Sequence, residues 1–66
     1  MSKEMQFFIY LIENYAYYKK TTADKVINTL IELNIYDKVF NSYEFYHIER
    51  LENAYLDIDK LIEENK

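Results

Sequence analysis

Histidine is the side chain that most readily exchanges protons near neutral pH, and this 66-residue chain has one, His47. Glu44 and Glu49 flank it in sequence, so a carboxylate could orient its ring for general-base catalysis. Catalysis would also need a nucleophile beside the ring, and Ser42 is the only serine besides Ser2. We favour instead a structural histidine that caps a helix end through a ring nitrogen, because nothing in the sequence specifies a catalytic geometry.

A metal or cofactor site is also disfavoured by the residue types. One histidine and no cysteine make a zinc site improbable. Asp57 and Asp59 have the spacing of calcium-loop carboxylates, but the chain has no glycine to turn such a loop. Without glycine there is no phosphate-binding loop either. We therefore expect no catalytic residues, no metal and no cofactor, in a protein that is not an enzyme.

Composition limits the classes of protein that remain. The length allows a single helical domain, residues 1–66. The absence of cysteine excludes disulfides, and the net charge of −4 makes direct nucleic-acid binding unlikely. The longest apolar run, Phe7 to Ile12, is too short to span a bilayer, and no signal-peptide pattern precedes it. We expect a cytoplasmic protein with no membrane partner.

The elements that would position these residues are helices. Glycine and proline are absent and half of the residues are hydrophobic, which favours an all-α fold, a compact bundle of three to four short helices. The first helix is expected from Ser2 or Lys3 to Tyr18, with Ser2 as its N-cap. The second is expected from Ala23 to Leu33, after a capping box at Thr21–Asp24 and with Asn34 as its stop.

The second half of the chain is less sharply patterned. A third helix is expected from Asp37 to Phe45, although the aromatic stretch Ser42–His47 would also suit a strand. Apolar spacing from Ile48 to Ile62 predicts a last helix, and Asp57 is an alternative N-cap for a separate final one. The expected core comprises Phe8, Ile9, Ile12, Val26, Ile27, Leu30, Phe40, Leu51, Ile58 and Leu61.

The first predicted helix carries two apolar stripes, although a helix in a small bundle normally buries one face. The expected contact residues on its second stripe and beside it are Phe7, Tyr10, Leu11, Tyr17 and Tyr18. Eight tyrosines also exceed what a core of this size can hold with every hydroxyl paired, and tyrosine is enriched at protein interfaces. The pattern predicts a protein-interaction surface, the alternative being rim residues that cover an undersized core.

Size and charge add two further arguments for association. Below about 70–80 residues a lone core seldom contributes more than about 3–5 kcal/mol, so binding another protein, or a second copy as a homo-oligomer, is a natural source of stability. From Glu44 onward there are seven acidic and three basic residues. Such a segment is usually a solvated face, and it would otherwise imitate nucleic acid or meet a basic partner.

Several short segments together resemble a small bacterial family of unknown function, domain-of-unknown-function family thirty-seven ninety-one. They are Phe8–Ala16, Thr21–Leu33, Tyr43–His47 and Asp57–Ile58, and the residues that carry the likeness are Glu13, Tyr15, Tyr43, His47 and Asp57. Tyr46 stands where the family usually has leucine, and the glycine often found after His47 is absent. This departure bears on the shape of the turn there.

The resemblance implies a partner. Members of that family are often encoded beside a larger domain that resembles ADP-ribosyltransferases, which implies a toxin-like enzyme with a neutralising, antitoxin-like or accessory subunit. We therefore expect a non-enzymatic protein-interaction module. The alternatives are a homodimeric structural or regulatory protein, and an acidic phage or mobile-element inhibitor that mimics nucleic acid.

Overall fold

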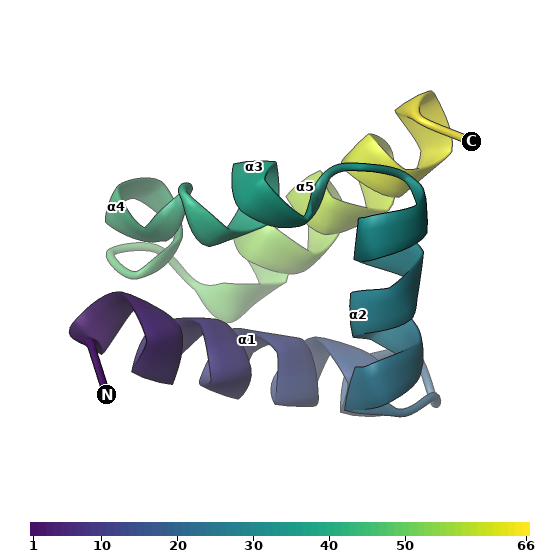
Figure 1. Cartoon of the computed structure of the whole chain (residues 1–66). Coiled ribbons are helices and arrows are strands. Elements are labelled where there is room, and N and C mark those ends of the chain that lie inside the picture. The colour runs from purple at the N-terminus through teal and green to yellow at the C-terminus, as the bar shows by residue number, and fades with distance from the viewer.

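The computed structural model describes all 66 residues and contains helices but no strands, which confirms the all-α prediction. The helices are α1 (Lys3–Tyr18), α2 (Ala23–Glu32), α3 (Tyr36–Phe40), α4 (Tyr43–Tyr46) and α5 (Leu51–Glu64). Figure 1 shows α1 lying lengthwise beneath α3 and α4, with α2 crossing at its C-terminal end and α5 behind α3. None of these helices has the length and apolar character that a bilayer span requires.

The ends of α1 follow from local chemistry. The Ser2 hydroxyl accepts a hydrogen bond from the Met5 amide at 3.1 Å, which confirms the predicted N-cap. At the other end Lys20 has φ 60°, the left-handed conformation that closes many helices. The Lys20 amide bonds the Tyr17 carbonyl and the Thr21 amide bonds the Ala16 carbonyl, so the last carbonyls of α1 are satisfied.

The second helix begins at Ala23 as predicted and ends at Glu32, one residue before the predicted Leu33. Asn34 has φ 60°, and the Ile35 amide bonds the Leu30 carbonyl at 2.9 Å, so the chain stops α2 at the expected asparagine. The N-cap is Thr22, not the first residue of the predicted Thr21–Asp24 box, and its hydroxyl caps no backbone amide. A hydrogen bond with the Thr22 side chain is instead the main cause that lowers the pKa of the exposed Asp24 carboxyl.

The prediction of a single third helix over Asp37–Phe45 is wrong in one respect, because this region forms two short helices, α3 and α4. The Ser42 amide bonds the Val39 carbonyl at 3.2 Å, and its hydroxyl donates to the Lys38 carbonyl at 2.8 Å. The side chain thereby replaces one bond of the helical ladder, which lets the backbone turn between α3 and α4.

The last helix is continuous, so the alternative of a separate final helix capped by Asp57 is wrong. Asp57 lies inside α5, and its carboxylate accepts a hydrogen bond from the Tyr46 hydroxyl. The helix begins at Leu51, because the chain reverses after α4 and Arg50 is still extended. Ile48, expected on the apolar face, lies in that reversal and is 74% exposed.

Fourteen buried residues from all five helices and the turn before α3 form one core. They are Phe8, Leu11, Ile12, Tyr15, Ala16, Val26, Leu30, Ile35, Val39, Tyr46, Ala54, Tyr55, Ile58 and Leu61. Of the predicted core, Ile27, Phe40 and Leu51 are only partly buried. Ile9 is wrong, since it is 40% exposed on the side of α1 away from the core.

Candidate protein-interaction surface

The tyrosines divide into two groups according to what holds them. Three of them are buried, namely Tyr15, Tyr46 and Tyr55. Two more are partly buried, namely Tyr36 and Tyr43. The other three are Tyr10, Tyr17 and Tyr18, which are 53%, 87% and 57% exposed. All three exposed tyrosines lie on α1, and the other exposed aromatic ring, Phe45 at 69%, lies on α4.

We define the aromatic strip as Phe7, Tyr10, Asn14, Tyr17 and Tyr18 on α1. At 100° per residue, Tyr10, Asn14 and Tyr17 lie on the side of the helix away from its buried residues, and Phe7 and Tyr18 lie at the edge of that side. Leu11 was expected among the contact residues, and this is wrong, since it is 1% exposed. The helical rotation places Leu11 between Phe8 and Tyr15, both of which are buried.

Neighbouring helices hold the two ends of the strip. The Phe7 ring meets the Tyr43 ring of α4 edge-on, with centroids 5.6 Å apart. Tyr18 stacks on Tyr55 of α5, with centroids 5.0 Å apart and planes 24° from parallel. The strip is therefore supported at both ends by packed rings, which restricts the motion of its side chains before any partner binds.

An open groove of about 620 Å³ lies at the C-terminal end of the strip. It is lined by Asn14, Tyr17, Tyr18, Lys20, Thr21 and Tyr55. The Asn14 side-chain amide donates to the Tyr10 carbonyl at 2.7 Å, which leaves its Oδ1 oxygen as an acceptor. Burial, and after it the carboxylate of Glu52, raises the pKa of Tyr55.

His47 has a local structural contact. Its Nδ1 lies 2.6 Å from the Tyr43 carbonyl oxygen, and its ring stacks on the Tyr43 ring with centroids 4.2 Å apart. This is the helix-end contact expected of a structural histidine. The Ser42 hydroxyl donates to the Lys38 carbonyl, and no hydrogen bond joins His47 to Ser42, Glu44 or Glu49.

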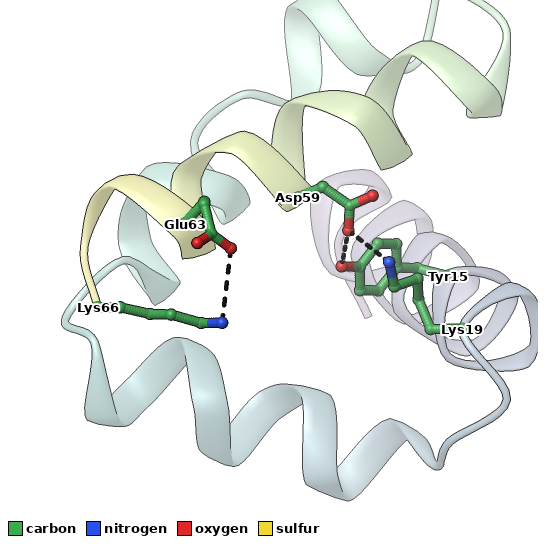
Figure 2. A network of polar contacts seen from close by, with 5 residues as sticks. All are labelled: Tyr15, Lys19, Asp59, Glu63 and Lys66. Atoms are coloured by element: carbon green, nitrogen blue, oxygen red, sulfur yellow. Dashed lines mark hydrogen bonds and ion pairs between the residues drawn. The ribbon is translucent and has the colours of Figure 1, made fainter.

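Two buried tyrosines bond to carboxylates on α5. The Tyr15 hydroxyl donates to Asp59 at 2.5 Å, and the Lys19 ammonium lies 3.2 Å from the same Asp59 oxygen. Figure 2 shows Asp59 meeting the side chains of Tyr15 in α1 and of Lys19 just after it. Tyr46 makes the equivalent bond to Asp57. Burial, followed by these hydrogen bonds to carboxylates, raises the pKa of both tyrosines.

These carboxylates are therefore parts of the fold. Asp57 and Asp59 flank Ile58, which is fully buried, and they bond tyrosines on different helices. No group of three or more acidic or histidine side chains is placed to hold a metal ion. The sequence interpretation missed this role. The signal that could have indicated it is a pair of carboxylates on either side of a core isoleucine, which does not identify their tyrosine partners.

The residues of the predicted family signature do not form a single cluster. Tyr15 and Asp57 are hydrogen-bonded to α5 and α4 respectively, and Tyr43 and His47 stack on each other. Glu13 is exposed on α1 and forms no ion pair or side-chain hydrogen bond. Four of the five signature residues thus make contacts that hold the fold together, and Glu13 is exposed and makes none.

The comparison with protein families agrees with the resemblance seen in the sequence. The model of a family described as a protein of unknown function, DUF3791, matches residues 6–65. The chain belongs to this family. The search of curated proteins found no match, and neither did the search of solved structures. Membership in this family assigns no activity to the chain.

Proposed function

We propose that this chain is a non-enzymatic protein-interaction module and that the aromatic strip on α1 is its contact surface. The observation that supports this is the concentration of Tyr10, Tyr17 and Tyr18 on one helix, each more than half exposed. Tyrosine combines a large apolar area with few rotatable bonds and one polar end, which suits it to interfaces.

The exposed area is consistent with an interface of ordinary size. Taking about 200 Å² for a tyrosine side chain, the three exposed tyrosines present about 400 Å². The largest apolar patch on a typical monomer is about 300–600 Å² and is often functional. A standard interface buries about 800 Å² per partner, so these tyrosines would supply about half of one side.

The expected partner follows from the family resemblance. A toxin-like enzyme with an ADP-ribosyltransferase-like domain would be masked if the strip covered its substrate cleft, and the chain would then act as its antitoxin-like or accessory subunit in the cytoplasm. Such masking requires contact area and shape, and it requires no catalytic group on this chain.

Co-expression with the product of the adjacent gene tests the proposal. A tagged chain is expected to retain that protein at micromolar concentration and to lower its activity. The double substitution Tyr10→Ala and Tyr17→Ala should abolish both effects, whereas Ile31→Ala, which alters an exposed side chain on α2, should change neither. Absence of a complex with the unsubstituted chain, together with unchanged enzyme activity, would contradict the proposal.

A further inference from the structure

The spacing along the aromatic strip is the same when it is followed from either end. At intervals of three, four and three residues it places Phe7, Tyr10, Asn14 and Tyr17. Such intervals bring side chains to the contact line of two helices that pack side by side. A second copy of α1 running in the opposite direction therefore presents the same side chains in matching order. Around a two-fold axis midway between Tyr10 and Asn14, Phe7 lies level with Tyr17 of the other copy, and Tyr10 with Asn14.

The polar groups of the strip also suit an identical surface. The Asn14 side-chain amide donates one N–H to the Tyr10 carbonyl, which leaves a second N–H as donor and the Oδ1 oxygen as acceptor. A tyrosine hydroxyl likewise both donates and accepts. Tyr10 and Asn14 of opposite copies can therefore bond in either direction, and a symmetric dimer contains this pair twice.

The charges beside the strip are mixed, so they select neither a cationic nor an anionic partner. Lys3, Glu13 and Lys20 are all exposed and form no ion pair. Residues 1–43 contain five basic and five acidic side chains, so the net charge of −4 comes from residues 44–66. A second copy that approaches along α1 therefore does not bring two strongly anionic surfaces together.

The exposed area is that of a weak dimer. The three exposed tyrosines of the strip present about 400 Å² on each copy, or about 800 Å² on two copies. Complexes that bury less than about 1,200 Å² in total are mostly weak and transient. Figure 1 shows no other helix on the side of α1 that faces away from α3 and α4, so two copies can meet along its length.

We infer that two copies of the chain pair through the aromatic strip with their α1 helices antiparallel. Each copy then covers the aromatic surface that the small core of the other leaves exposed. The pairing goes beyond the proposed function and shares with it only the strip as the contact surface. Because the strip holds one occupant at a time, the dimer and a complex with another protein exclude each other, and a tighter partner displaces the second copy.

Sedimentation equilibrium of the full chain tests the pairing. Between about 10 µM and 1 mM the chain is expected to pass from monomer to dimer, with a dissociation constant of about 100 µM. Tyr10→Ala with Tyr17→Ala should weaken the dimer at least about tenfold, since each substitution is present twice. Phe45→Ala is the matched control, because it removes a ring that is 69% exposed on α4, outside the strip. Circular dichroism verifies that each variant is folded.

Isotope-filtered NMR of mixed labelled and unlabelled chains tests the direction of the helices. Contacts are expected between the Phe7 ring of one copy and the Tyr17 ring of the other. Within one chain these residues are about 15 Å apart along α1, at 1.5 Å per residue, so such contacts arise only between copies. Contacts of Phe7 with Phe7 would show a parallel pair and overturn the antiparallel arrangement.

Glu13 distinguishes a second copy from other occupants of the strip. It lies one residue from the two-fold axis, so the two Glu13 carboxylates approach each other across the dimer. Glu13→Gln should therefore strengthen the dimer by about twofold to threefold. Glu32→Gln, which removes an exposed carboxylate of α2, should leave the dissociation constant within about a factor of two. Raising the salt from about 50 to 500 mM should not weaken the dimer.

The inference is overturned if the chain is a monomer at about 1 mM, where a dimer of this area should form. It is also overturned if the dimer survives Tyr10→Ala with Tyr17→Ala, is lost in Phe45→Ala, or is weakened by Glu13→Gln. If the chain stays monomeric but the adjacent gene product binds through the strip, the proposed function stands and this inference alone fails. A dimer that binds no adjacent gene product gives the opposite result.

Discussion

At the scale of single residues, the buried tyrosine hydroxyls are the polar contacts with the largest expected effect on stability. Tyr15→Phe removes the donor to Asp59, which keeps its ion pair with Lys19 and some solvent contact. We expect the free energy of unfolding to fall by about 1–2 kcal/mol, as measured by urea denaturation. Tyr17→Phe is the control, because Tyr17 is 87% exposed. An equal loss of stability in both variants would contradict this role for Tyr15.

The raised pKa values of Tyr15 and Tyr46 also predict an alkaline transition. Above pH 10, the ordinary value for tyrosine, the unfolded chain loses these protons while the folded chain keeps them. Stability is therefore complete below about pH 10 and then falls by at most about 1.4 kcal/mol per pH unit for each tyrosine. Urea denaturation between pH 8 and 11 measures the slope, which should be shallower in Tyr15→Phe. Identical slopes would show that Tyr15 does not cause the transition.

Lys20 adopts a backbone conformation that glycine adopts at less cost. Its φ of 60° costs about 1–2 kcal/mol in an L-residue, and the greater chain entropy of glycine offsets part of the gain. We expect Lys20→Gly to stabilise the chain by about 0.5–1 kcal/mol. The same substitution at Lys60, which is exposed inside α5, should destabilise it by about 1 kcal/mol. Thermal melts of the two variants should shift in opposite directions, and a lower melting temperature for Lys20→Gly would refute the argument.

At the scale of the elements, the break between α3 and α4 depends on Ser42. Its hydroxyl donates a hydrogen bond to the Lys38 carbonyl, whereas the Ser42 amide donates to the Val39 carbonyl instead. Although alanine has the higher helix propensity, we expect Ser42→Ala to destabilise the chain by about 0.5–1 kcal/mol. Thr29→Ala removes a similar hydroxyl bond, to the Lys25 carbonyl, inside α2. There the Lys25 carbonyl already accepts a backbone hydrogen bond of the helix, so chemical denaturation should show no loss of stability. Stabilisation by Ser42→Ala would mean that propensity outweighs the turn.

Local signals were sufficient for the start of α1 and the end of α2. Ser2 as a cap and Asn34 as a stop depend on interactions within a few residues, and the structure has both. The break at Ser42 and the start of α5 at Leu51 were not predicted. They depend on how α4 packs against α5 through Tyr46, a contact between residues eleven positions apart.

At the scale of the whole molecule, the small core leaves a narrow margin of stability. A core of this size contributes no more than about 3–5 kcal/mol of net stability, and Leu30, which is fully buried, costs about 2–5 kcal/mol when truncated to alanine. We expect Leu30→Ala to be largely unfolded at 25 °C by circular dichroism. Ile31→Ala is the control on the next residue, which is 58% exposed, and it should melt close to the parent. A cooperative melt of Leu30→Ala near that of Ile31→Ala would show that the core is larger than we infer.

The sequence by itself determined that the chain is helical, that α1 is capped at Ser2 and α2 stops at Asn34, and that α1 has more aromatic surface than one buried face can use. These properties depend on composition, spacing and short-range hydrogen bonds. Only the tertiary structure decided which side of α1 is buried, and so exchanged Ile9 and Leu11 between surface and core. Since α1 carries apolar residues on most of its circumference, its own periodicity cannot orient it. The packing of α2, α3 and α4 against it, and the bond from its Tyr15 to Asp59 of α5, orient it instead.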